Sequence, residues 1–251
     1  MAVSNELNTL KTNILSAYTM IQNKGGAIPT NKNTQNLSNA INTIPSGGGI
    51  DDYFGSISSK ASNDVTLLYY MTKIPDLQGA PSSLQELFYN AQHVTEIGNI
   101  NTSKVRNFSK TFYNCRALKS LKQYDTSLGK DFSQCWYNCY DLTTIPELNF
   151  NDANSINRIF YSCSSLKDLG GFLNLGQNYD TTLPVNYSAY TLDLNASTKL
   201  THDSLMNVIN KIYDIATKGC KAQKLTLGTD NKAKLTAEEI AIATNKGWTV
   251  S

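Results

Sequence analysis

Cysteines are the first residues whose type and spacing could do chemistry in this chain of 251 residues. Cys135 and Cys139 lie close together, and such thiolates can hold zinc when further ligands join them, for which Cys115 and Cys163 are candidates. However, Cys115, Cys139 and Cys163 recur at one constant interval, and Ala91 stands one interval earlier. A small buried side chain explains this series better than a metal site does. We therefore predict buried free thiols and no metal or cofactor, with zinc and disulfide bonds as alternatives.

Acid–base and nucleophilic catalysis has few candidate residues here. The two histidines, His93 and His202, belong to no nucleophile or metal motif, and we predict that both are incidental surface residues. The sequence contains no Gly-x-Ser-x-Gly, no phosphate-binding glycine loop and no dinucleotide motif. Its acidic residues do not recur in pairs at a spacing that suggests glycosidase chemistry. The sequence therefore predicts a protein that is not an enzyme, and a hydrolase is the lower-ranked alternative.

Four tyrosines form the one candidate ligand-binding site. Tyr89, Tyr113, Tyr137 and Tyr161 recur at the same interval as the cysteines, each directly after a large aromatic residue that we expect to be buried. We expect each tyrosine to be at least half exposed, so that a row of aromatic faces could stack against the sugar rings of a cell-wall polymer. The alternative is that these tyrosines cover the core and leave their hydroxyls in water.

The tyrosines belong to an internal 24-residue repeat, which is the strongest pattern in the sequence. The segments that begin at Phe88, Phe112, Trp136 and Phe160 are alike, and each supplies one member of what we call the aromatic column. Further apolar columns share this period: Val94, Leu118, Leu142 and Leu166; Ile97, Leu121, Ile145 and Leu169; Ile100, Tyr124, Leu148 and Phe172; Phe108, Phe132 and Ile156.

Such a repeat predicts layers that stack and place equivalent side chains in ladders through a continuous core. The Leu-x-x-Ile columns suggest a short strand on one face, and the Phe-x-x-Cys spacing suggests a helical turn on the other. Residues 67–75 look like a degenerate first unit, one residue out of phase, that caps the stack. We therefore predict an α+β fold, a leucine-rich-repeat solenoid with an N-terminal helical module and an α/β C-terminal cap.

The N-terminal segment predicts two helices. Over residues 4–23 an apolar stripe follows the spacings of three and four that are typical of a coiled-coil seam. A second helix is expected over residues 33–43, and Gly47-Gly48-Gly49 reads as a hinge. We predict that the stripe joins copies of the chain or attaches them to another protein; docking on the chain's own body is the alternative. The stripe consists of Leu7, Leu10, Ile14, Ala17 and Ile21.

The C-terminal segment loses the period and predicts a cap of alternating strands and helices. We expect strands at Leu192–Leu194 and Leu225–Leu227, a helix over residues 203–216, and a capping box at Thr236 that opens a last helix, after which Trp248–Val250 completes the cap. The predicted domains are residues 1–45 (attachment or oligomerisation module), 46–50 (hinge), 51–175 (solenoid) and 176–251 (cap).

Composition and charge limit the classes of partner. The formal net charge is +2 and the 22 basic residues are scattered among 20 acidic ones. Because a nucleic-acid-binding protein neutralises the phosphate backbone with clustered Lys and Arg, we expect no nucleic-acid partner. No apolar run reaches the roughly 18–20 residues of a membrane span. The first residues lack the basic and apolar regions of a secretory signal, so we also expect no export by that route and no membrane insertion.

The repeat resembles a known family. Residues 112–127, FYNCRALKSLKQYDTS, resemble BspA-like leucine-rich repeats, whose units read MF-x-x-C-x-x-L-x-x-L-x-x-F-D-T-S. Residues 161–166, YSCSSL, follow the same pattern, and the resemblance covers roughly residues 65–175. It implies a fold and no particular function.

The two ends of the chain resemble tail proteins of phages that infect Gram-positive bacteria. Residues 8–14 and 24–37 look like the N-terminal module of such proteins, and residues 200–206 and 241–248 resemble the closing segment of phage leucine-rich-repeat proteins. This resemblance implies a virion structural protein of the tail tip or baseplate, assembled in the host cytoplasm without a signal peptide. Its partners would be other tail proteins. The alternative role is that of a host-recognition module, which binds glycan or protein on the cell surface.

Overall fold

The computed structural model describes the repeats and the C-terminal segment almost completely, and only short pieces of the N-terminal segment. The described residues are 14–15, 17–19, 21–22, 27–32, 36, 71–74, 76–77, 79–178, 191–217 and 222–251. The predictions for Leu7, Leu10, the glycine hinge and nearly all of the second helix lie outside these residues.

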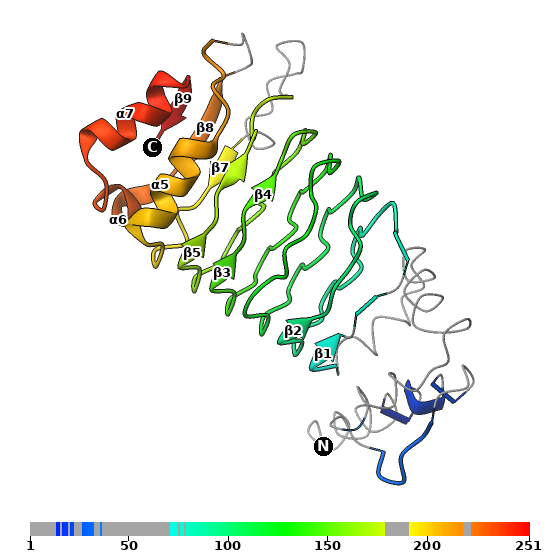
Figure 1. Ribbon diagram of the computed structural model, residues 1–251. Coiled ribbons are helices and arrows are strands. Elements are labelled where there is room, and N and C mark those ends of the chain that lie inside the picture. The colour runs from blue at the N-terminus through cyan, green and yellow to red at the C-terminus, as the bar shows by residue number, and fades with distance from the viewer. Residues whose placement is uncertain are drawn as a thin grey trace.

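Chain segments that are one repeat apart lie side by side, as Figure 1 shows for the successive turns of the chain. Short parallel strand pairs and single bridges join neighbouring turns, and in each pair after the first the partners are one full repeat apart. We call residues 82–175 the turn stack. Its strands are β2 (Glu96–Ile97), β3 (Thr144–Ile145), β4 (Leu148–Asn149), β5 (Asp168–Leu169) and β6 (Phe172–Leu173), with β3 paired to β5 and β4 to β6.

The first pair keeps a different register. Strand β1 (Lys73–Ile74) pairs in parallel with β2, and Ile74 lies opposite Ile97, so that these partners are one position closer in sequence than those of the later pairs. The prediction that this first unit is one residue out of phase is thus confirmed. Met71 and Ile74 are buried, so the unit extends the core of the turn stack by one layer.

The strands are only two residues long because of the spacing of the buried residues. Leu142, Ile145 and Leu148 are all buried, and each follows the previous one after three positions. In a regular strand successive side chains alternate between the two faces, so inward positions recur at every second residue. A spacing of three is incompatible with that alternation, so the chain turns again after each two-residue strand.

The other side of each unit, the Phe-x-x-Cys segment, consists of single hydrogen-bonded turns and contains no continuous helix. In the Phe-x-x-Cys segment, Cys115 N donates to Phe112 O at 3.1 Å, but Lys110 and Asn114 have φ values of 52° and 59°. A left-handed residue ends a helix, so two such residues four positions apart leave only single turns. The same two positions have positive φ in every unit from Glu86 to Ser162.

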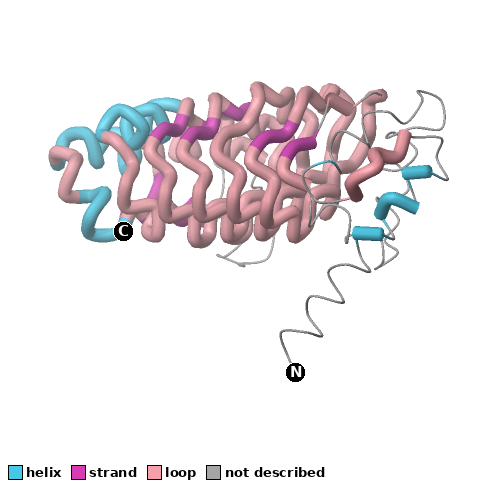
Figure 2. Tube along the Cα trace, turned by 90° about the horizontal axis from the view of Figure 1, so that it is seen from below, coloured by secondary structure: helices cyan, strands magenta, loops and turns pink. Residues whose placement is uncertain are grey.

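The predicted fold class, an α+β leucine-rich-repeat solenoid, is therefore wrong. The described residues instead form small sheets of short parallel strand pairs, joined by turns and loops, with few helices. Figure 2 shows the helices of the C-terminal segment gathered at one end of the molecule, while turns and loops make up most of the rest.

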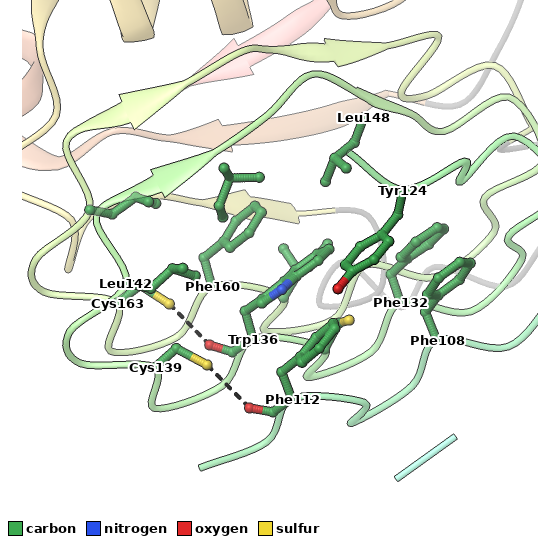
Figure 3. Packing of buried hydrophobic residues seen from close by; sticks show 14 of the residues in the cluster. Phe108, Phe112, Tyr124, Phe132, Trp136, Cys139, Leu142, Leu148, Phe160 and Cys163 are labelled. Atoms are coloured by element: carbon green, nitrogen blue, oxygen red, sulfur yellow. Dashed lines mark hydrogen bonds between the residues drawn. The ribbon is translucent and has the colours of Figure 1, made fainter. Parts of the chain in front are cut away.

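The core of the turn stack is filled by aromatic rings in register, as the apolar columns predict. Phe112 stacks on Phe88 at 5.6 Å and on Trp136 at 5.9 Å between ring centroids, and Trp136 stacks on Phe160 at 5.3 Å. All four rings are at most 1% exposed. Figure 3 shows this column beside the second one formed by Phe108 and Phe132.

The C-terminal segment adds a three-stranded parallel sheet and three helices. Its order is β7-β8-β9, and the Cα register pairs Leu192 with Leu225 and Leu225 with Val250. The strands and helices predicted here are confirmed, although helix α5 ends earlier than expected and the sequence did not predict α6. Their bounds are β7 (Thr191–Asp193), α5 (His202–Lys211), β8 (Gln223–Thr226), α6 (Gly228–Lys232), α7 (Ala237–Asn245) and β9 (Trp248–Val250).

Helix α7 begins with the predicted capping box. Thr236 Oγ1 accepts from Glu239 N at 3.2 Å, and Glu239 Oε2 accepts from Thr236 N at 2.8 Å, which satisfies two N–H groups at the start of the helix. The end of α5 is closed by Lys246, whose Nζ donates to the carbonyls of Ile209, Asn210 and Ile212 at 2.6–3.1 Å. This lysine joins the two helices, because it follows α7 and bonds the last turn of α5.

Candidate functional site

The four predicted site tyrosines form a continuous ladder on the surface of the turn stack. The ring centroids of Tyr89 and Tyr113, Tyr113 and Tyr137, and Tyr137 and Tyr161 are 4.7, 4.7 and 4.8 Å apart, with interplanar angles of 8°, 8° and 15°. The spacing equals the distance between neighbouring strands of a sheet. We call these residues the tyrosine ladder.

Each ladder tyrosine lies between two residues whose backbone is in the left-handed conformation (positive φ), and these two residues hold it at the surface. In the second unit they are Lys110 and Asn114, and Tyr113 N donates to Lys110 O at 3.2 Å to close the turn. Asparagine tolerates positive φ better than most residues because its short side chain bonds locally. Here the amides also bond each other across the turns, since Asn114 Nδ2 donates to Asn90 Oδ1 and Asn138 Nδ2 to Asn114 Oδ1, both at 2.8 Å.

The exposure of the ladder is lower than predicted. Tyr161 is 46% exposed, whereas the other three tyrosines are only partly exposed. Tyr113 and Tyr137 each stack against a tyrosine on both sides, so both faces of these two rings are covered. Sugar rings therefore have no access to the inner ring faces, contrary to the expected row of stacking platforms. The ladder offers its ring edges and hydroxyls instead.

Two arginines lie over exposed tyrosine rings, one in the second unit of the ladder and one in its last unit. The Cζ of Arg158 is 5.8 Å from the ring centroid of Tyr161, and that of Arg116 is 5.7 Å from the ring centroid of Tyr140. Tyr140 is 38% exposed, and both arginines are exposed. Such cation–π contacts attract each guanidinium to the face of its ring. Sequence analysis missed Arg116, Arg158 and Tyr140 because the residue type at their repeat positions changes from unit to unit.

The hydroxyl of Tyr137, within the ladder, keeps its proton at neutral pH. The pKa of Tyr137 is raised above its usual value of 10.0 by desolvation first, and then by the neighbouring hydroxyls of Tyr113 and Tyr161. A phenol that keeps its proton can donate a hydrogen bond as well as accept one. The ladder is thus a row of hydrogen-bond donors and acceptors.

The four described cysteines are free and buried, as predicted. Cys139 Sγ donates to Phe112 O at 3.1 Å and Cys163 Sγ to Trp136 O at 3.0 Å, so each thiol bonds the preceding turn (Figure 3). Burial raises the pKa of Cys163 to about 12. Among the described residues no group of His, Cys, Asp and Glu has the arrangement of a metal site. Cys220 lies outside them.

Both histidines lie at the surface, as predicted, but His202 is not the incidental residue that the sequence predicts. His93 is exposed. His202, at the start of α5, places Nε2 2.9 Å from Glu239 Oε1 and Nδ1 3.3 Å from Asp203 Oδ1. The hydrogen bond to Glu239 raises the pKa of His202 most, and that to Asp203 adds to it. This group ties α5 to α7 and has a structural role.

Of the predicted attachment residues, the described ones are turned inward. Ile21 is 1% exposed and belongs to the buried core, as do Ala17 and Tyr18, and Ile14 packs partly buried against them. In this conformation Ile21 is covered by the chain itself and does not offer a surface to a partner. Leu7 and Leu10 lie outside the described residues, so the attachment role stays a prediction.

The comparisons with known proteins concern the turn stack. Residues 82–184 match a protein family described as "Mycoplasma protein of unknown function, DUF285". No curated protein and no solved structure matches the chain. Among the described residues no helix is long and apolar enough to cross a membrane. The family match concerns the segment that carries the tyrosine ladder, and its description assigns no activity.

Proposed function

We propose that this chain is a non-enzymatic structural protein of a phage tail tip or baseplate, in which the turn stack is displayed on the virion. The resemblance of both ends to tail proteins and of the repeats to BspA-like units supports this role. The tyrosine ladder is the observation that carries it, because a row of stacked side chains on a repeated backbone suits a binding surface rather than a reaction site. Its proposed partners are other tail proteins.

The packing of the turn stack supports a structural role in physical terms. The rings of the aromatic column in its interior are at most 1% exposed, and each turn bonds the next through backbone and side-chain hydrogen bonds. Because every layer is fixed to its neighbours, the surface rows keep their spacing under load.

A second candidate function is host recognition. The exposed rings of Tyr140 and Tyr161, each with an arginine over it, favour this role, because tyrosine and arginine are enriched where proteins bind partners. In this case the turn stack binds glycan or protein on the host surface, and the N-terminal module attaches it to the tail.

Deletion in a phage that encodes the chain separates the two roles. Removal of residues 51–251 should abolish tail assembly if the chain is structural, and should leave intact particles that no longer adsorb if it recognises the host. As a control, removal of residues 1–45 should release the chain from particles in either case. Normal assembly together with normal adsorption after the first deletion would contradict both proposals.

A further inference from the structure

The two arginines beside the tyrosine ladder have a charge that the described part of the chain does not neutralise. Arg116 and Arg158 take part in none of the ion pairs found among the described residues. By contrast, Lys110, at the repeat position equivalent to Arg158, is paired with Glu86 at 3.3 Å. The guanidinium groups therefore keep donors for an external anion, which arginine binds well through two parallel hydrogen bonds.

These groups gather around Tyr137. Its ring stacks with Tyr113 and Tyr161 on either side, and its hydroxyl is close enough to Arg158 and Tyr140 for both to influence its pKa. Arg116 joins the group through its contact with the ring of Tyr140. We call Tyr113, Tyr137, Tyr140, Tyr161, Arg116 and Arg158 the Tyr/Arg face.

The backbone of this face is closed to a peptide strand. Asn114 N donates to Tyr137 O and Asn138 N to Tyr161 O, both at 2.8 Å, so these carbonyls already accept hydrogen bonds from the neighbouring turn. A peptide that adds to a sheet needs an open row of backbone groups. The inner ring faces are covered as well, so a ligand meets side-chain hydroxyls, amides and guanidinium groups. Such a surface suits a polar polymer with many acceptors.

We propose that the Tyr/Arg face binds an anionic glycan, with its carboxylate or phosphate groups on Arg116 and Arg158 and its sugar oxygens along the tyrosine hydroxyls. This inference rests on the recognition role proposed above and names its ligand class. Exposed Asp141, next to Tyr140, is the acidic neighbour in sequence and limits the excess positive charge of the face. The anionic groups of the ligand therefore lie at the guanidinium groups rather than all along the ladder.

The repeats themselves supply conservative variants for a test. Gln134 occupies the position equivalent to Arg158 one turn earlier, with φ of 55° against 52°, so Arg158→Gln preserves the local backbone. Gln92 is equivalent to Arg116 in the first unit, so Arg116→Gln is similarly conservative. Arg106→Gln removes one exposed arginine away from the Tyr/Arg face and is the charge-matched control.

Binding is measured by calorimetry with the full chain and four polymers: polygalacturonate, phosphomannan, neutral dextran and polyglutamate. We expect one or both anionic glycans to bind, and their comparison distinguishes carboxylate from phosphate. Each Tyr/Arg-face variant should bind about tenfold more weakly, equivalent to about 1.4 kcal/mol, and Arg106→Gln should bind as the parent does. The affinity should fall with added salt.

Several results would overturn the inference. They are binding of dextran as tight as that of the anionic glycans, unchanged binding by both variants, or no binding of either anionic glycan. Polyglutamate that binds as tightly as the glycans would assign the face to an acidic protein instead. If neither glycan binds but the chain is found in the tail, the structural role stands and only the glycan inference fails. If a glycan binds but the chain is absent from particles, only the tail role is contradicted.

Discussion

The ring of Phe112 stacks on the indole of Trp136 at 5.9 Å with an interplanar angle of 11°, although one full repeat separates them in sequence. One position further along, Tyr113 stacks on Tyr137 at 4.7 Å. The same register therefore produces a buried column and a surface ladder. Changes in the first should affect stability, and changes in the second should affect binding.

Truncation of the buried column should be costly. Phe112→Ala should lower the free energy of unfolding by about 3–5 kcal/mol, because the neighbouring rings of Phe88 and Trp136 cannot close the cavity without leaving register. Urea denaturation followed by circular dichroism measures this change. The control is Tyr140→Ala, at a ring that is 38% exposed, which should cost far less. Equal losses for the two variants would contradict the assigned register.

The asparagines of the ladder turns should be sensitive to backbone conformation. Asn114→Ala removes two amide hydrogen bonds and leaves at φ of 59° a residue whose side chain cannot form local hydrogen bonds. We therefore expect the free energy of unfolding to fall by about 2–3 kcal/mol. Asn114→Gly loses the same bonds without that strain and should cost about 1 kcal/mol. Both are measured by urea denaturation. A glycine variant less stable than the alanine variant would show that this turn is not left-handed in solution.

The buried thiols should be inert in the folded protein. Burial raises the pKa of Cys139 and Cys163, and the thiolate is the reactive form. In a Cys220→Ser background, dithionitrobenzoate at neutral pH should modify none of the four remaining cysteines before denaturant is added and all four afterwards. Fast modification of Cys139 in the folded chain would contradict its position in the core.

The contact between α5 and α7 should stabilise the fold in a limited pH range. The pKa of His202 is raised above 6.5, chiefly by Glu239. The contribution of His202 to the free energy of unfolding is therefore complete below pH 6.5 and is lost as pH rises through the raised pKa. The pKa of Glu239 is lowered below 4.5, first by the Thr236 backbone N–H and then by His202, so its contribution is lost as pH falls through that lower value.

The difference in urea midpoint between the parent chain and His202→Gln should therefore be largest between pH 4.5 and 6.5. It should shrink at higher pH, where His202 is neutral. Asp203→Asn serves as a control, because this contact is longer, at 3.3 Å, and Asp203 is more exposed than Glu239. A difference that grows as pH rises above 6.5 would contradict the proposed ion pair.

The repeated features of the structure were open to prediction from the sequence. The aromatic column and the cysteine positions were read from their period, and the capping box at Thr236 from its local pattern. The period is a strong signal because it is repeated, and the capping box is a strong signal because it is confined to a short stretch of sequence. The predicted fold class is wrong, because the described residues form pairs of two-residue parallel strands with few helices, and the spacing of three between buried residues such as Leu142 and Ile145 keeps each strand that short.

Features present only once escaped prediction. The contact of Arg158 with Tyr161 depends on how one side chain folds over a neighbour, and no column records it. Helix α6 is only five residues long, and it is held by buried Asn231, whose Nδ2 donates to the carbonyls of Leu194, Ser197 and Leu227. These acceptors lie up to 37 residues away in sequence. Contacts of this kind are fixed by tertiary packing rather than by local sequence.

The proposed role places the chain in the phage tail, where it displays the turn stack. Electron cryomicroscopy of purified particles can locate it. We expect density for the stacked turns, one for each repeat, at the tail tip or baseplate, with the ladder around Tyr137 facing outward or against a partner, and the N-terminal module toward the particle. Particles that contain no such density, and no peptides of this chain by mass spectrometry, would contradict the claim.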